Sequence, residues 1–155
     1  VILDCMNLDL SHTFESCLHK QTIAKKIFES CITPEEKYRK IIELGKHLPP
    51  YPSINKTSEH LVKGCQSTMY LCSHLKETKM YFEVSSEALI SAGLAALLLS
   101  VYQEEFPEVI LKCPPLFLEE IGLYMALSPS RSNGLSSLFL RMKQEALKAL
   151  TKKIN

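Results

Sequence analysis

The chain has 155 residues, 46% of them hydrophobic, which suits one globular domain with a buried core and leaves little room for a second. Its 18 basic and 17 acidic residues are intermixed and give a formal net charge of +1, so the sequence carries no electrostatic footprint for nucleic acid or an anionic membrane. The longest apolar run, 94–99, is far shorter than a membrane span.

Cysteine usage bears on the compartment and on metal binding. The spacings are irregular and no Cys-x-x-Cys occurs, which favours free thiols in a reducing compartment over a disulfide scaffold. The closest pairs of zinc-type ligands are Cys65 with Cys72 and Cys72 with His74, a poor set. Residues 1–9 lack the basic segment of a signal peptide. We therefore expect a cytoplasmic protein without a metal or a cofactor of its own. The cysteines are Cys5, Cys17, Cys31, Cys65, Cys72 and Cys113.

Two helices are predicted in the first third of the chain. Residues 1–20 show little periodicity and are expected to form an N-terminal arm, ahead of a single domain at 21–155. Apolar spacing over 21–31 predicts an amphipathic helix. A second helix is predicted to start with Thr33-Pro34-Glu35-Glu36, because the threonine supplies an N-cap and Glu36 stands three residues later. The proline-rich stretch 49–56 ends it and predicts an extended surface connection.

Three short runs predict β-strands, at 61–63, 68–75 and 79–85, with a turn near Glu77-Thr78 between the last two. Together they predict a small antiparallel sheet of about three strands with one buried face. The polar stretch Gly64-Cys65-Gln66-Ser67 separates the first two runs and indicates a tight turn. Cys65 is therefore expected at a hairpin tip.

A core helix is predicted after the sheet. Ser86 and Glu87 are expected to cap it, and it runs to about residue 103. Its apolar residues cover nearly all sides, which is typical of a helix in the core. Gly93 within it is expected to allow close packing against the sheet.

Shorter helices and a long one are predicted towards the C-terminus. Helical turns are expected at 107–110 and 114–121, the second closed by Gly122. A polar loop at 128–134 then leads to a last helix from about 133 to 152. The basic C-terminal half of that helix suits the helix dipole.

Cys65 is the first candidate functional residue. A thiol at a turn tip is open to the chemistry of another molecule, whereas a thiol within a strand behaves as a small hydrophobe. Gly64 removes bulk beside the sulfur, and the amides of the turn, with Lys63, can stabilise a thiolate. From these residues alone, a reactive thiol and a merely exposed one both remain open.

Arg131 is the second candidate. It stands among serines in the predicted loop, where an arginine is either a solvated surface charge or a cap to a neighbouring helix. The functional alternative is that it folds back to lower the pKa of the Cys65 thiol or to meet an acid on a partner. The residues alone do not decide between these alternatives.

Four stretches, in order over roughly 28–149, resemble the SufE family of sulfur-acceptor proteins. Gly-Cys-Gln-Ser combined with Leu-Ser-Pro-Ser-Arg-Ser-Asn-Gly is specific, although either motif alone would not be. Glu87 stands where an aspartate is common in the family, and 1–17 and 49–61 show no family match. The matching stretches are 36–48, Val62 to Ser67, Ser86 to Ala88 with Gly93-Leu94, and Leu127 to Leu135.

The resemblance implies an α+β fold in which a curved antiparallel sheet is covered by helices, as in the U-type iron–sulfur scaffold proteins. It implies that Cys65 takes persulfide sulfur from a SufS-like, pyridoxal-phosphate cysteine desulfurase, stimulates that enzyme and passes sulfur to a SufBCD-like scaffold. The chain would be a sulfur carrier rather than a stand-alone enzyme. The resemblance is also compatible with a weak homodimer. Free Cys65 is expected to be largely buried against an apolar cavity and to swing out on docking. The supporting residues by motif are Gly64, Gln66, Ser67, Glu87 and Arg131.

Two other classes stay open. A cysteine-dependent transferase or hydrolase would pair Cys65 with His60 or His74 as the base. A U-type metal scaffold would need several convergent thiolates, and only Cys72 is expected near Cys65. Cys72 could also resolve a Cys65 persulfide into a disulfide, although its apolar neighbours favour a packed strand residue.

Overall fold

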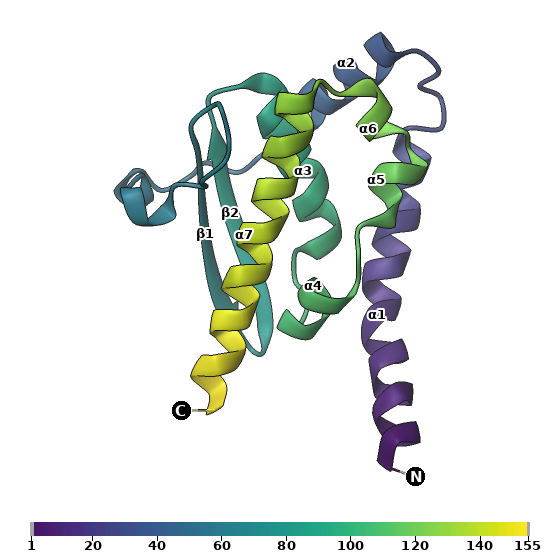
Figure 1. Cartoon of the computed structure of the whole chain (residues 1–155), viewed down its shortest axis with the longest axis vertical. Coiled ribbons are helices and arrows are strands. Elements are labelled where there is room, and N and C mark those ends of the chain that lie inside the picture. Colours follow the sequence, from purple (N-terminus) through teal and green to yellow (C-terminus); the bar gives the residue numbers. More distant parts are fainter. Residues whose placement is uncertain (1, 155) are drawn as a thin grey trace.

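The computed structural model describes residues 2–154, and the side chains of residues 14–152. It confirms the α+β class: a two-stranded antiparallel sheet packs against a set of helices. Figure 1 shows α3 in the middle of the molecule, with the sheet and α7 on one side and α1 on the other. The described elements are α1 (Ile2–Ile27), α2 (Pro34–Gly45), the 3₁₀ turns η1 (Ser53–Asn55) and η2 (Ser58–His60), β1 (Met69–Lys76), β2 (Lys79–Ser86), α3 (Leu89–Tyr102), α4 (Pro107–Lys112), α5 (Leu116–Glu120), α6 (Leu123–Ala126) and α7 (Pro129–Ile154).

Helix α1 is longer than predicted at its N-terminal end. It begins at Ile2 instead of residue 21 and ends at Ile27, so the backbone of 2–20 is helical, and the helix crosses the expected boundary at residue 20 without a break. Cys17, Gln21 and Ala24 are buried on its inward side, and Phe28, directly after its last residue, is buried as well. A hydrophobic pattern misses this stripe because two of its members are a cysteine and a glutamine. Residue 1 and the side chains before Phe14 lie outside the described part of the expected arm.

Helix α2 begins where the sequence predicted. Glu36 N donates to Thr33 Oγ1 and Thr33 N donates to Glu36 Oε2, both at 3.2 Å, which completes a capping box. Helix α2 packs closely against α3, since a Cβ added to Gly93 would lie only 2.0 Å from Ile41 O. The expectation that Gly93 packs against the sheet is therefore wrong, because this glycine faces α2.

The sheet has two strands instead of about three. Register runs from Met69 opposite Ser86 to Lys76 opposite Lys79, so the predicted turn consists of Glu77 and Thr78. Both turn residues have positive φ (51° and 74°), the geometry of a type I′ hairpin. The expected strand at 61–63 reduces to one bridge, Leu61 with Tyr70, because turn η2 precedes it and the turn at residues 63–64 follows directly.

The buried face of the sheet covers α3. Leu71 on β1 and Phe82 and Val84 on β2 alternate inwards, as predicted for a half-buried sheet. Helix α3 starts at Leu89 with Ala88 in the N-cap position and no side-chain cap on that residue. Glu87 is exposed and outside the helix, so the prediction that it helps to cap α3 is wrong.

Helix α7 begins earlier than predicted. Residues 129–134, expected in a loop, form its first turns. Ser128 is the cause: its Oγ accepts from Arg131 N at 3.4 Å, its carbonyl accepts from Ser132 N at 3.0 Å, and Pro129 occupies the first helical position. A serine- and proline-rich stretch predicts a loop and a helix start equally well, which explains the difference.

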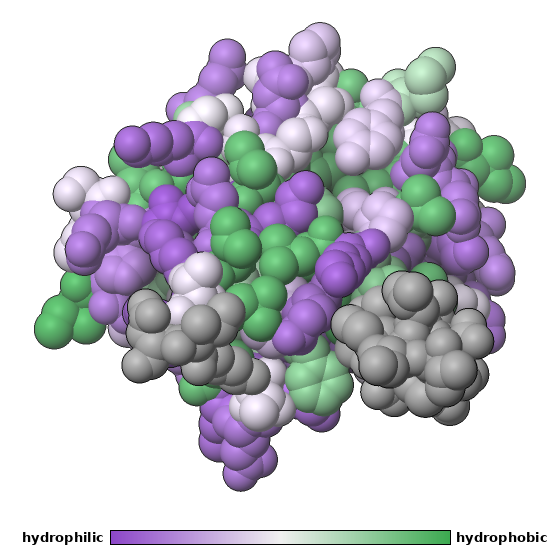
Figure 2. Space-filling view, turned by 60° about the horizontal axis from the view of Figure 1, so that its bottom comes forward, coloured by the Kyte–Doolittle hydropathy of each residue, from purple (hydrophilic) through white to green (hydrophobic). Residues whose placement is uncertain are grey.

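The surface is mixed in character. Figure 2 shows a face on which apolar side chains gather near the centre with hydrophilic ones around them, in keeping with the intermixed charges of the sequence. Within the described residues, no helix combines the length and the apolar character needed to cross a membrane.

Candidate functional site

Cys65 lies in a loop between the bridge at Leu61 and the start of β1, which agrees with the predicted hairpin position. Its Sγ approaches the carbonyl of Gly134 on α7 at 3.6 Å, and its side chain packs partly against the hydrophobic core. The thiol is half-buried, so it is less enclosed than the expected largely buried position. The loop thus lies on the first turns of α7.

Gly64 allows this close approach. Its φ is +91°, a conformation that favours glycine, and a Cβ there would lie 2.4 Å from Ser137 Oγ on α7. A side chain at this position would clash with Ser137, so either that hydroxyl or the loop would have to move. The glycine beside the thiol therefore serves contact with α7 as well as access to the sulfur.

A cavity of about 250 Å³ opens beside the thiol. It lies where the Cys65 loop, the start of α3 and the start of α7 meet. Most of its lining is small and polar, with one cation, which differs from the expected apolar cavity. The lining residues are Cys65, Gln66, Ser67, Ala88, Ser91, Ser130, Arg131 and Gly134.

Hydroxyl groups connect Arg131 to the Cys65 loop. Arg131 Nη1 donates to Ser91 Oγ at 3.2 Å, and the hydroxyls of Ser91 and Ser67 lie 3.1 Å apart. Arg131 is therefore held in the cavity wall, and its link to the loop passes through Ser91. A guanidinium and hydroxyl donors around a small cavity are chemically suited to an anion such as a thiolate or a persulfide.

Burial raises the pKa of the Cys65 thiol, because desolvation disfavours the thiolate. Lys63, which was expected to help stabilise a thiolate, has an exposed side chain. In this closed arrangement the thiol is mainly protonated at neutral pH. Burial therefore keeps the Cys65 sulfur in its less reactive, protonated form.

The structure brings together only some of the predicted site residues. Gly64, Ser67 and Arg131 lie around Cys65, and Gln66 lines the cavity with an exposed side chain. Glu87 is exposed and does not line the cavity. Sequence reasoning assigned no site role to four further contributors, although two of them lie in the quoted motif 127–135 and a third is a serine in the otherwise apolar core helix. These residues are Ser91, Ser130, Gly134 and Ser137.

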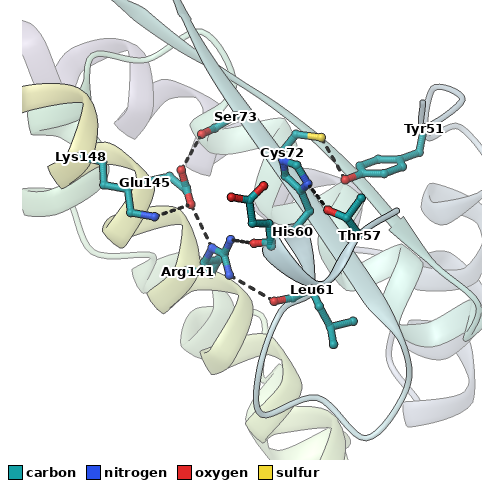
Figure 3. A network of polar contacts seen from close by, with 10 residues as sticks. Tyr51, Thr57, His60, Leu61, Cys72, Ser73, Arg141, Glu145 and Lys148 are labelled. Carbon is teal, nitrogen blue, oxygen red and sulfur yellow. Dashed lines mark hydrogen bonds and ion pairs between the residues drawn. The ribbon is translucent and has the colours of Figure 1, made fainter. Parts of the chain in front are cut away.

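The residues of the alternative functions lie elsewhere. His60 Nδ1 is 2.9 Å from Thr57 Oγ1 and His74 stacks on Tyr81, so neither histidine lines the Cys65 cavity. Cys72 is buried on β1, with its Sγ 2.9 Å from the hydroxyl of Tyr51 (Figure 3). Among the described side chains, no three or more His, Cys, Asp or Glu residues are grouped as metal ligands.

Comparison with known proteins points to one family. The SufE family model, described as an Fe-S metabolism associated domain, matches residues 21–146. An uncharacterized SufE-like protein of Rhizobium meliloti is 38% identical over 117 residues, covering 72% of this chain and 84% of that protein. The sulfur acceptor protein CsdE of Escherichia coli is 34% identical over 145 residues, covering 92% of this chain and 95% of that protein. The solution structure of a hypothetical protein from Thermus thermophilus superposes with a TM-score of 0.71 at 27% identity, covering 85% of this chain and 96% of that one.

Proposed function

Since this chain belongs to the SufE family, we propose that Cys65 accepts sulfur from the persulfide of a cysteine desulfurase and carries it to an iron–sulfur assembly scaffold. The relative named as a sulfur acceptor protein aligns with nearly the whole chain, at 92% coverage. The structural observation that carries the proposal is the position of Cys65: it follows a glycine in a loop and faces a small cavity with hydroxyl and guanidinium donors.

The transfer step needs no external oxidant. The Cys65 thiolate, its proton given up to solvent, attacks the outer sulfur of the donor persulfide. The donor's S–S bond breaks as a new S–S bond forms on Cys65, and the donor cysteine leaves as a thiolate. Electrons balance because one disulfide-type bond replaces another.

Loop opening supplies the reactive form. Desolvation raises the pKa of Cys65 in the closed loop, so movement into a hydrated or electropositive donor pocket lowers that pKa towards its ordinary value and releases the thiolate. On return, the outer sulfur of the persulfide lies at the cavity, where Arg131 and the hydroxyls of Ser67 and Ser91 can donate to it. The closed loop then protects the persulfide from solvent thiols.

The proposal includes two partners, which the family resemblance implies. The donor is a SufS-like enzyme that carries the pyridoxal phosphate, and the recipient is a SufBCD-like scaffold, both in the cytoplasm. Removal of the persulfide frees the desulfurase for its next turnover, so the chain stimulates that enzyme.

The test is alanine release by a cysteine desulfurase given free cysteine without a reductant. The enzyme alone stops when its persulfide is not removed, and added native chain should release further alanine, at least about one equivalent per chain, since each sulfur that Cys65 accepts frees the desulfurase for one more turnover. Cys65→Ser should release none, and Cys31→Ser, at another partly exposed thiol, should match the native chain. Equal release by native chain and Cys65→Ser would refute the proposal.

A further inference from the structure

One face of α7 follows the Cys65 loop back towards its start. Gly134, Ser137, Arg141 and Glu145 are spaced three and four residues apart, so they line one side of the helix. Gly134 meets the Cys65 thiol and Ser137 meets Gly64. The next residue along this face, Arg141, meets the chain that leads into the loop.

Each of the three nitrogens of the Arg141 guanidinium donates a hydrogen bond (Figure 3). Nη2 donates to Glu59 O at 2.6 Å and Nη1 donates to Leu61 O at 3.2 Å, so it holds two carbonyls at the base of the loop. Nε donates to Glu145 Oε1 at 3.0 Å. A planar guanidinium can satisfy three acceptors at fixed angles, which a lysine ammonium on a flexible stem does not reproduce.

Glu145 fixes the arginine to the sheet. Its Oε2 accepts from Ser73 Oγ on β1 at 3.1 Å, while its Oε1 receives Arg141. The side chains of Arg141 and Glu145 are each only 17% exposed, so water screens this pair less than it would a surface pair. The contact between β1, α7 and the loop base is thus a closed, charge-assisted network.

We propose that Arg141 is the positioning residue for Cys65: by holding the carbonyls of Glu59 and Leu61 on α7, it sets the balance between the closed and open loop. Beyond Arg141, the loop base is tied by the Val62 N to Met69 O hydrogen bond at 2.8 Å. Loss of the two arginine contacts therefore leaves a loop that is still attached to β1 but is held on α7 only by the weaker contacts of Cys65 with Gly134 and of Gly64 with Ser137. This inference deepens the proposed function, since it names what controls the acceptor thiol.

The experiment is site-resolved alkylation of the free 155-residue chain with iodoacetamide, read by peptide mass spectrometry. Arg141→Met should raise the labelling rate of Cys65 about tenfold, the factor that corresponds to ~1.4 kcal/mol of lost closing free energy. The buried thiols Cys17 and Cys113 report global unfolding, and their rates should not change. Arg141→Lys, which keeps the charge without the planar fork, should also raise Cys65 labelling.

Lys148→Met is the matched control. It removes the same charge from the same helix and loses a 3.6 Å contact with Glu145, but Lys148 is 65% exposed, and among the described side chains the hydrogen bonds to the loop carbonyls of Glu59 and Leu61 come from Arg141. Its Cys65 labelling should equal that of the native chain. An unchanged Cys65 rate in Arg141→Met, or an equal rise in Lys148→Met, would overturn the inference. If Cys17 and Cys113 also become reactive in Arg141→Met, that variant has unfolded and Arg141→Lys takes its place. A rise in Cys65 labelling alone in Arg141→Lys supports the inference, and an unchanged Cys65 rate overturns it.

No desulfurase takes part in this experiment. A negative result would remove the role of Arg141 and leave sulfur acceptance by Cys65 intact. Conversely, if the native chain fails to stimulate alanine release but Arg141→Met still raises Cys65 labelling, sulfur acceptance is refuted and the role of Arg141 in positioning the loop stands.

Discussion

Cys65 combines two requirements that oppose each other. A sheltered position protects a bound sulfur, but the same burial raises the pKa of the thiol and keeps it protonated. Gly64 allows the loop to bring Cys65 into this half-buried position, because its positive φ and missing side chain let the loop pack against Ser137. The residue pair Gly64-Cys65 therefore sets the half-buried position of the thiol, and the proposed transfer requires the loop to leave that position.

The pH dependence of Cys65 alkylation should show this burial. In the folded chain the labelling rate should reach half its maximum at a higher pH than the same residue shows in urea, where the thiol is hydrated. The native state keeps the proton to higher pH than the unfolded state, so this thiol's contribution to stability is lost as pH rises from the ordinary to the raised pKa. Coinciding profiles in the native and urea-unfolded chains would contradict the assignment of burial as the cause.

Gly64→Ala should destabilise the chain by about 2 kcal/mol, because it adds both a strained backbone and a clash with Ser137. Urea unfolding measures this change. The double variant with Ser137→Gly removes the clash but keeps the strain, so its Gly64→Ala penalty should be smaller. An undiminished penalty would mean that the contact with α7 does not limit the loop.

Packing between elements depends on a close approach of α2 to α3. Gly45 and Gly93 face each other across this contact, since a Cβ on Gly45 would lie 2.7 Å from Gly93 N. A Cβ on Gly93 would meet the backbone of Ile41, which cannot rotate away as a side chain can. The pair of helices is thereby fixed at a short distance, and the start of α3 is fixed beside the Cys65 cavity.

Gly93→Ala should therefore cost about 3 kcal/mol or more, at the upper end for overpacking in a core. Gly134→Ala is the matched change in another helix: its Cβ would lie 3.8 Å from Cys65 Sγ, an ordinary contact. That variant should be as stable as the native chain or gain about 0.5–1 kcal/mol from helix propensity. Similar melting temperatures for the two variants would contradict the close α2–α3 contact.

The elements that sequence predicted well are those whose signal is local. The capping box of Thr33 and Glu36 and the two-residue turn at Glu77-Thr78 each depend on a few neighbouring residues. The start of α7 was missed because Ser128-Pro129 is common both in loops and at helix starts. For the site, the motifs paired Cys65 with Arg131, whereas Ser91 enters only through the packing of α3 against the loop. Such contacts belong to tertiary structure and leave no local pattern.

At the scale of the whole molecule, α1 is tied to the body by buried polar contacts. Lys20 Nζ lies 2.9 Å from Glu105 Oε1 and donates to Gln103 O at 2.6 Å. The carboxylate oxygen has no aligned hydrogen bond, so this is an ion pair without a hydrogen bond. Gln21 on the same helix donates to Pro114 O at 3.1 Å. These contacts hold α1 against the segments that follow α3 and α4.

Lys20→Met should destabilise the chain by about 3 kcal/mol, because it leaves the carboxylate of Glu105, a residue only 2% exposed, without its cation. Lys26→Met, at an exposed position of α1, should change stability by less than about 0.5 kcal/mol. Adding Glu105→Gln to Lys20→Met removes the unpaired charge and should recover part of the loss. Full stability of Lys20→Met in urea unfolding would show that α1 is held in another way.

The most direct test of sulfur acceptance is the mass of the chain itself. The native chain and Cys65→Ser are incubated with a cysteine desulfurase, pyridoxal phosphate and free cysteine, and intact and peptide masses are then recorded without a reductant. Our account predicts a gain of one or more sulfur atoms on the native chain, mapped to the peptide that contains Cys65 and absent from Cys65→Ser. Sulfur gained equally by the variant, or none gained from the cognate desulfurase while that enzyme turns over, would contradict it.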